Sequence, residues 1–302
     1  MSSVFEQVFI LFVFAFTGFL LSKLKRIEAD KVSLLSTLEF YVFLPCMSFE
    51  TFAQQCSLTY LKTKYPLILI SVGILLLLEL LARCIAPHLS KKHYQQLVYR
   101  YSLIAPNFGF FGYSLMRGLF GAEGLMDMMM FCLPLSIYTT TIGYAVLTNQ
   151  PGKLSVKKML TPSIYGMFLG AIIGVTGICL PNAIMQIVEK SSVCVAPISM
   201  LLAGAVIAQY NFKELLTNKQ AYFISFMRLI AIPAMIFFLL KTIGLEIAIL
   251  SAVITYCCPC GLNPIVYGKL ANQDCRDGAS LTLLSTVFSM LTIPLCVYLF
   301  LG

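Results

Sequence analysis

Two short breaks rich in proline, glycine and asparagine interrupt long apolar stretches at matching places in the two halves of the chain. The first runs from Ala105 to Gly112 (APNFGFFG) and the second from Cys258 to Pro264 (CPCGLNP). The leading prolines of the two breaks, at positions 106 and 259, lie 153 residues apart, which is close to half of the 302 residues. Proline removes a backbone donor and glycine weakens a helix, so both segments are predicted to be unwound.

The composition makes a lipid bilayer the natural solvent for this chain. Hydrophobic residues make up 59% and charged residues only 11%, and the mean hydropathy is +0.88. A soluble domain of this size does not need so much apolar surface. In a membrane, unwound backbone is tolerated only where protein buries it or where it lines a watery cavity. Paired interrupted helices in corresponding halves therefore point to the binding site of a secondary transporter.

The apolar stretches predict ten membrane-spanning helices, because a span needs roughly 20 apolar residues. The breaks fall in the fourth and ninth of them. The predicted spans are 4–22, 32–52, 65–86, 96–118, 125–147, 160–179, 188–209, 219–240, 245–270 and 277–301.

The ten spans are predicted to form two five-helix repeats of opposite orientation. Pro45 in the second span and Pro197 in the seventh lie 152 residues apart, nearly the same offset as the breaks. The net charge is +8, and 15 of the 21 Lys and Arg lie in or beside the loops that follow the odd-numbered spans. Five lie on the other side. Cytoplasmic loops carry the excess of basic residues, so both termini are expected outside the cytoplasm. We expect an all-α fold with a first repeat at 1–148, a cytoplasmic linker at 149–159 and an inverted repeat at 160–302.

Each break splits its helix into two half-helices, and the N-terminal end of a half-helix presents free N–H groups with a partial positive charge. Two inverted copies would bring two such ends together near the middle of the membrane, which suits an anion such as a carboxylate. Asn107 and Asn263 can donate or accept hydrogen bonds there. Neither break contains Asp or Glu, which disfavours a cation antiporter with paired carboxylates. The alternative is a pair of kinked helices that only pack.

Charged residues inside predicted spans are candidates for function by default. Arg228 could attract an anionic substrate or form an ion pair with Glu79 of the third span. Glu79 could instead pair with Arg83 along its own helix, since the two are four residues apart. Glu39 and Glu50 lie near the ends of the second span and are expected to be solvated.

Three further motifs favour ordinary packing over chemistry. Cys257 and Cys260 have the spacing of a redox or metal motif but lie in an apolar span without a second ligand pair. Met126 and the run from Met128 to Met130 have no His or Cys pattern beside them that would suggest copper. His88 and His93 lie in a basic loop that is expected to be solvated. No nucleophile motif or phosphate loop is present, so we expect neither an enzyme nor a cofactor.

The chain resembles the auxin efflux carrier family over essentially its whole length. The stretch Leu44 to Phe49 (LPCMSF) is similar to the family's proline-containing second span. Pro106 to Gly109 (PNFG) and Pro259 to Pro264 (PCGLNP) are similar to its crossovers in the fourth and ninth spans. Arg228 to Pro233 resembles its eighth span, and the tail from Leu281 to Leu295 resembles its last.

This resemblance implies a ten-helix inverted-repeat fold with a scaffold domain and a transport domain, in which the fourth and ninth helices cross at their prolines. It also implies a homodimer, for which no GxxxG-type face stands out in the sequence. The substrate carboxylate would bind beside the crossover. With Gly109 and Asn263 of the two breaks, the predicted substrate-binding residues are Leu44, Pro45, Pro106, Asn107, Gly109, Pro259, Gly261, Leu262 and Asn263.

We therefore expect a multi-pass transporter of small organic anions in the plasma membrane, with the bilayer and a second copy as partners and no role in binding nucleic acid. One alternative is a sodium-coupled symporter on the related bile-acid-carrier fold, which would need a cluster of oxygen ligands around the crossing helices. Sodium-independent uptake would exclude it. A second alternative is a membrane receptor or sensor, which an appended soluble domain would support.

Overall fold

The computed structural model describes residues 2–27, 31–148 and 160–301. In these ranges the chain forms helices, and its only β-type pairing is an isolated bridge between Pro106 and Cys260. The all-helical fold class is therefore confirmed. The predicted linker at 149–159 lies outside the described residues.

The elements are mostly α-helices, with four short segments of π or 3-10 helix among them (η1 to η4). Their bounds are α1 Ser2–Lys23, α2 Val32–Leu38, η1 Glu39–Phe43, α3 Leu44–Gln55, α4 Leu58–Lys64, α5 Pro66–Leu89, α6 His93–Ile104, η2 Phe108–Gly112, α7 Tyr113–Thr140, α8 Ile142–Leu147, α10 Pro162–Thr176, α11 Asn182–Val193, α12 Val195–Ala208, α13 Phe212–Leu216, α14 Lys219–Phe226, η3 Met227–Ala231, α15 Ile232–Ile243, η4 Glu246–Ala248, α16 Ile249–Cys257, α17 Asn263–Leu270 and α18 Arg276–Leu301.

Seven helical stretches within the described residues are long and apolar enough to cross a membrane. They are Ser3–Lys23, Val32–Gln55, Leu58–Leu89, Phe108–Leu147, Asn182–Ala208, Lys219–Ile243 and Arg276–Leu301. The prediction of ten spans includes shorter pieces as well. The sixth predicted span falls on the 15-residue α10, and the ninth is divided into α16 and α17 by the second break.

The fourth and fifth predicted spans meet inside α7. Gly121 there has φ 68° and ψ −162°, so two helices join across a kink at this residue. This region of backbone space is open almost exclusively to glycine, because a Cβ atom would clash. The kink lies between the predicted limits of the two spans, 118 and 125.

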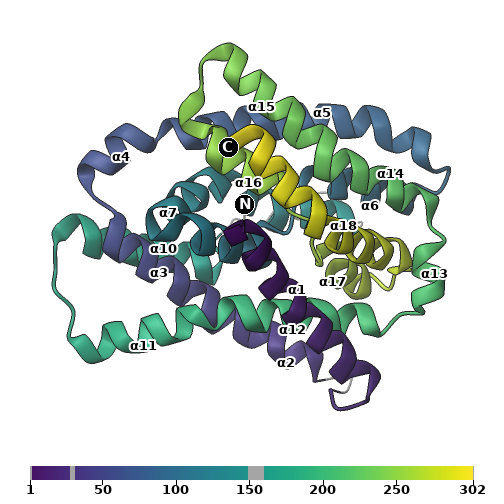
Figure 1. Ribbon diagram of the computed structural model, residues 1–302, viewed down its shortest axis with the longest axis horizontal. Helices are drawn as coiled ribbons and strands as arrows, with labels where there is room; N and C mark the ends of the chain where they lie inside the picture. Colours follow the sequence, from purple (N-terminus) through teal and green to yellow (C-terminus); the bar gives the residue numbers. More distant parts are fainter. Residues whose placement is uncertain (1, 28–30, 149–159, 302) are drawn as a thin grey trace.

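Two helix pairs pack so closely that backbone lies against backbone. Gly170 of α10 faces the carbonyl group of Phe49 in α3, and a methyl group added at Gly170 would lie 2.5 Å from that oxygen. Gly18 of α1 faces the carbonyl group of Leu201 in α12 in the same way. Small residues permit such close approach of helices in membranes, where dispersion contacts replace the hydrophobic effect as the source of association. Figure 1 shows α1 crossing α12, and α3 lying beside α10.

The expectation that no GxxxG-type face is present is wrong. Gly166, Gly170 and Gly174 repeat at intervals of four residues along α10. Their faces meet the backbone of Pro45, Phe49 and the Phe52–Cys56 turn of α3. This motif therefore joins two helices of one chain and is not free for a second copy.

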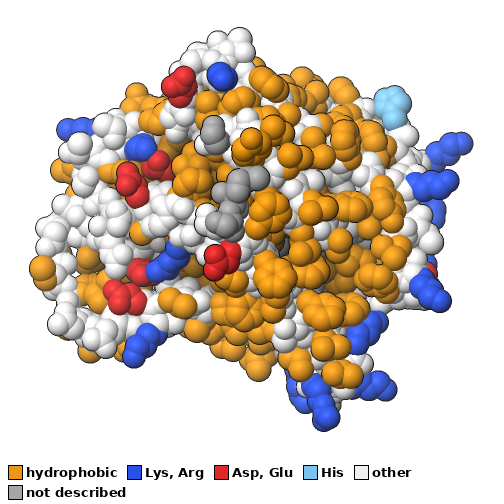
Figure 2. Space-filling view, in the orientation of Figure 1, with side chains coloured by type: hydrophobic (Ala, Val, Ile, Leu, Met, Phe, Trp, Pro, Cys, Tyr) orange, Lys and Arg blue, Asp and Glu red, His pale blue; other side chains and the backbone are white. Residues whose placement is uncertain are grey.

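The surface separates apolar from charged regions. In Figure 2 hydrophobic side chains cover the middle of the visible face, and Lys and Arg gather along its right and lower-right edges. Most of the acidic side chains of this face lie toward the opposite side. An apolar belt between charged ends is the pattern expected of a protein that crosses a bilayer.

The close contact between α3 and α10 predicts that Gly170→Ala destabilises the protein. The new methyl group would overlap the Phe49 carbonyl, and overpacking of this kind costs about 1–3 kcal/mol. Melting of the detergent-solubilised protein should show a lower midpoint. Gly73→Ala is the matched control, since Gly73 is exposed within α5 and an added Cβ meets nothing within 4 Å. An equal loss in both variants would contradict the packing argument.

Candidate functional site

The two breaks touch each other in the middle of the molecule. Both are non-helical, as predicted, over residues 105–107 and 258–262. The N–H of Asn107 donates a hydrogen bond of 2.8 Å to the carbonyl oxygen of Pro259, within the antiparallel bridge that pairs Pro106 with Cys260. Each break thus satisfies a backbone group that its own helix can no longer satisfy.

Side chains from α18 hold the second break in place. The Oγ of Ser285 accepts a hydrogen bond of 2.9 Å from the N–H of Cys260, and the hydroxyl of Thr282 donates one of 3.0 Å to the carbonyl of Gly261. Both side chains are buried. The sequence analysis included this stretch only as part of a family-like tail, and no local pattern shows which break it supports.

Arg228 supports the first break. Asn107 follows Leu103 by four residues, so its N–H would have extended α6 by bonding to the Leu103 carbonyl. That carbonyl instead accepts a hydrogen bond of 3.1 Å from Nη1 of Arg228. The guanidinium is fully buried and lies over the Tyr256 ring, 5.2 Å from its centroid. A cation is stabilised at the C-terminal end of a helix, where carbonyl groups are unpaired.

The proposed ion pair between Arg228 and Glu79 is wrong. Glu79 accepts a hydrogen bond of 2.8 Å from Arg83 along its own helix, and it also pairs with Arg100 of α6. The hydroxyl of Tyr138 donates to its second oxygen at 3.1 Å. Arg228 is not among the residues that line the cavity described next, and its Nε and Nη2 have no hydrogen-bond partner.

The expectation that Glu39 and Glu50 are solvated is also wrong. Glu50 is 5% exposed and is held by both terminal nitrogens of Arg117, each at 2.9 Å. Glu39 is completely buried in η1, and neither of its carboxyl oxygens has a hydrogen-bond partner. The position of a residue near the end of a predicted span does not show whether other helices pack over its side chain.

A cavity of about 140 Å³ lies where the two breaks meet. Seven of the nine predicted substrate-binding residues line it: Leu44, Pro106, Asn107, Gly109, Gly261, Leu262 and Asn263. Pro259 lies in the bridge and Pro45 packs against α10, so neither reaches the cavity lining. A cavity of this size can hold a molecule as large as benzene.

The lining also contains residues that sequence reasoning missed. They are aromatic or carry hydroxyl groups, and come mainly from the helices around the first break, the end of α7 and the start of α10: Phe40, Tyr101, Phe108, Phe110, Tyr113, Ser136, Thr139, Thr140, Thr161, Ser163 and Tyr267. Single hydroxyl and aromatic residues are common in apolar spans, so their sequence carries no signal of this convergence.

Polar contact in the cavity comes from uncharged groups. Nδ2 of Asn263 donates a hydrogen bond of 2.6 Å to the hydroxyl of Tyr101. Asn107 is 7% exposed and its side chain caps no helix N–H, so the side-chain amide is available to a ligand. Helical segments begin beside the cavity at Phe108 and Asn263, and the first amides of a helix have no partner within it. At the second start Pro264 has no N–H and the N–H of Ile265 donates to the Leu262 carbonyl at 2.9 Å, so this start contributes the amide of Asn263. None of the described residues in the lining carries a charge.

The cysteine and methionine motifs belong to the packed interior. The side chains of Cys257, Cys258 and Cys260 are fully buried, and the first two thiols donate to the carbonyl of Ile254. Met128 and Met129 are buried in the same apolar cluster. The described residues bring together no group of three or more His, Cys, Asp or Glu side chains that could hold a metal ion.

Comparison with known proteins gives one match that covers nearly the whole chain. Residues 3–297 match the model of a family described as "Membrane transport protein". The matched region contains both breaks, the α18 residues that hold the second break, and every residue of the cavity lining. No curated protein matches the chain.

The bond between Ser285 and Cys260 predicts that Ser285→Ala destabilises the second break. The Cys260 N–H would be left buried and unpaired, at a cost of about 1–3 kcal/mol. Ser289→Ala is the matched control, because Ser289 is equally buried on α18 but its hydroxyl donates only to Thr286 of the same helix. Thermal unfolding should show the larger loss for Ser285→Ala, and equal losses would rule out this role.

Proposed function

This chain belongs to the membrane transport protein family of auxin efflux carrier type, and from that premise we propose that it is a secondary active transporter of small organic anions, chiefly carboxylates. Membership establishes a multi-pass membrane transporter and accords with a protein that is not an enzyme. The substrate class, the site and the transport cycle are our proposals.

The observation that carries the proposal is the cavity between the two breaks. Its lining combines the amide of Asn107 and the starts of two helical segments with hydroxyl groups and aromatic rings. Helix N-termini favour anions, because their amide hydrogens point outward with a partial positive charge. The substrate carboxylate binds at these amides, and the rest of a small organic molecule contacts the apolar wall formed by residues such as Leu44 and Leu262.

Contacts between the halves support the proposed inverted repeat. The offset of 152 residues that relates Pro45 to Pro197 also relates Gly18 to Gly170 and Phe49 to Leu201. The contact of Gly18 with Leu201 is therefore the counterpart of the contact of Gly170 with Phe49, although different helices form the two contacts. A pseudo-twofold relation between the halves requires that one offset turns each of these contacts into the other, as the offset of 152 does here.

The contact between the breaks obeys the same relation at their own offset of 153 residues. Pro106 corresponds to Pro259, and Asn107 corresponds to Cys260. The bridge between Pro106 and Cys260 thus maps onto the contact between Pro259 and Asn107, which is part of the same bridge. A contact that maps onto itself lies on the twofold axis. We place the crossing of the fourth and ninth helices there.

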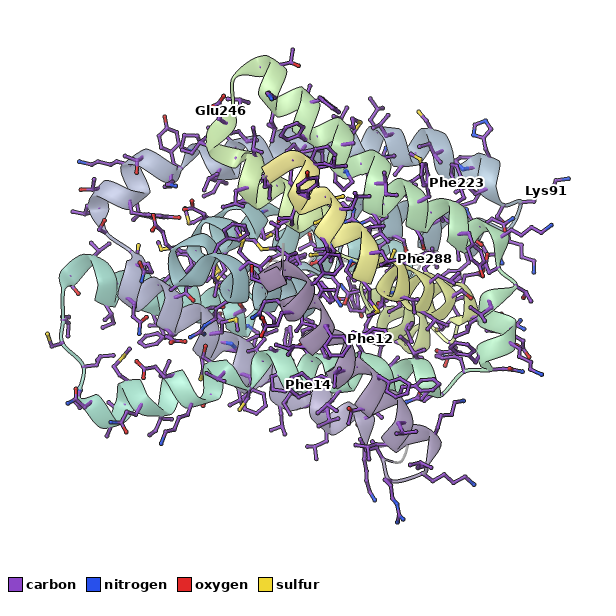
Figure 3. All side chains as sticks on the ribbon, in the orientation of Figure 1. Phe12, Phe14, Lys91, Phe223, Glu246 and Phe288 are labelled. Atoms are coloured by element: carbon purple, nitrogen blue, oxygen red, sulfur yellow. The ribbon has the colours of Figure 1, made fainter. Side chains whose placement is uncertain are left out.

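The charge distribution supports the proposed orientation in the plasma membrane, with both termini outside the cytoplasm. In Figure 3 Lys91 lies at the right-hand end of the molecule, whereas Glu246 lies at the top, left of the centre. Lys91 belongs to a loop assigned to the cytoplasm, and Glu246 to one assigned to the outside. The basic edge seen in Figure 2 is then the cytoplasmic one. The homodimer stays part of the proposal on the family resemblance alone.

A sodium-coupled symporter is the second candidate, and the hydroxyl-bearing residues of the lining favour it. Ser136, Thr139, Thr140, Thr161 and Ser163 bring five hydroxyl-bearing side chains to the cavity lining. Oxygen ligands suit hard cations such as Na⁺. The screen described next therefore includes sodium as a separate variable.

We expect a carboxylate to stabilise the purified protein against heat and Asn107→Ala to remove that effect. A ligand that binds only the folded state stabilises it by about 2.7 kcal/mol at 100 times its Kd. Loss of the Asn107 amide should weaken binding about tenfold or more, since hydrogen bonds to charged groups contribute about 1.5–3 kcal/mol. The measurement is a thermal-shift screen of mono- and dicarboxylates with and without sodium, followed by uptake of each hit into proteoliposomes.

Two further variants sharpen this test. Gly261→Leu should block uptake by filling the cavity, since an added Cβ would start 3.7 Å from Asn107 without a clash. Asn182→Ala, at an exposed residue far along the chain, is the control and should behave as the wild type. Unchanged uptake in both Asn107→Ala and Gly261→Leu would exclude this site. A shift with sodium but with no carboxylate would favour the symporter.

A further inference from the structure

An ion pair joins the helix that follows the first break to the close-packed helices. Arg117 of α7 donates to both carboxylate oxygens of Glu50 in α3 at 2.9 Å, and its Nη1 also donates to the hydroxyl of Ser192 in α11. The side chain of Glu50 is 6% exposed and that of Arg117 is 30% exposed. Paired hydrogen bonds between Arg and a carboxylate are strong and geometrically specific. They fix α7 against α3 and α11 on one face of the molecule.

The opposite face of the cavity is open. A groove of about 470 Å³ runs between α2, α12 and α17, and Lys269 lies in its wall. The groove and the cavity share Phe40, Phe110, Leu262, Asn263 and Tyr267, so the two spaces adjoin. Figure 1 shows α3, α7 and α11 toward the left of the view and α17 toward the right. The cavity therefore adjoins an opening on the Lys269 side, and the ion pair lies toward the other side.

The repeat offset connects these two faces residue by residue. The offset of 152 that relates Pro45 to Pro197 carries Glu50 to Leu202, Phe40 to Ser192 and Arg117 to Lys269. The offset of 153 that relates the breaks carries Arg117 to the next residue, Leu270, which lines the same groove. Lys269, Leu202 and Phe40 all line the groove. The three residues that touch on one face thus have counterparts that line an open space on the other face. In this structure the residues of the first set are in contact, whereas their counterparts line an open groove.

We propose that Arg117, Glu50 and Ser192 form the gate that closes the substrate cavity toward the extracytoplasmic side. The inference rests on the proposed function and adds the residues that control access to the site. In the opposite state the counterpart groove closes around Lys269, and Arg117 separates from Glu50. Because Leu202 stands where Glu50 has its counterpart, the cytoplasmic closure has no ion pair. The ion pair therefore favours the state that is open toward the cytoplasm.

Thiol labelling from each face of the membrane tests the gate. Gly109→Cys places a thiol in the cavity, where an added Cβ meets nothing within 4 Å. The background replaces with serine the four cysteines that are not buried, Cys46, Cys84, Cys179 and Cys194. The same background without Gly109→Cys is the blank. A charged, membrane-impermeant thiol reagent is added on one face or the other of oriented proteoliposomes.

With the gate intact, labelling should occur mainly from the Lys269 face. Arg117→Gln and Glu50→Gln should each raise labelling from the Arg117 face about tenfold, as expected when a buried charge pair loses one partner. Lys64→Gln is the control. It also breaks an ion pair, 2.6 Å long between Lys64 and Asp127, but that pair joins α4 to α7 without contacting α3. It should leave the ratio between the faces unchanged.

The reversed pair, Glu50→Arg with Arg117→Glu, should restore labelling toward the starting ratio, which a merely destabilised protein would not do. Unchanged ratios in both single variants, with melting midpoints close to the parent, would overturn the gate. Ratios that change as expected in a protein that neither binds nor transports any carboxylate would support the gate and refute the substrate class. The two proposals can therefore fail separately.

Discussion

The architecture depends on one backbone contact, the hydrogen bond from the N–H of Asn107 to the carbonyl of Pro259. Two interrupted helices in a bilayer leave amide and carbonyl groups without partners, and each such group is costly there. The breaks resolve part of this by pairing with each other, while Arg228 and Ser285 satisfy the Leu103 carbonyl and the Cys260 N–H. The cavity lies where the two breaks meet, beside polar groups such as the Asn107 amide.

The support of this contact is uneven between the halves. The first break is held by a buried guanidinium, and the second by hydroxyl groups on α18. A guanidinium donates several hydrogen bonds in a fixed plane, whereas a hydroxyl group can turn to donate or accept. In the proposed repeat, two equivalent positions thus reach the same result with different chemistry. The proposed repeat is therefore marked by prolines and glycines and not by the side chains that support the breaks.

Features that depend on the backbone could be predicted from the sequence, and those that depend on distant pairing could not. The prolines and glycines of the breaks indicated unwinding, and the apolar stretches placed the helix ends near Gly121 correctly. The pattern of Gly166, Gly170 and Gly174 was present in the sequence but was overlooked. The burial of Glu50 was not predictable, since its partner Arg117 lies 67 residues away and neither residue type is apolar. The same holds for the hydroxyl groups that converge on the cavity from α7 and α10.

The glycine contacts of α1 with α12 and of α3 with α10 have a consequence for conformational entropy. Helices that meet through backbone and glycine immobilise few rotamers when they associate, whereas contacts through Lys, Arg or Met restrict many. A rise in temperature therefore destabilises these two helix pairs less than it destabilises contacts made by long side chains. In the proposed transport cycle, each of these two pairs would therefore stay together as a rigid unit while the helices that carry the breaks shift beside it.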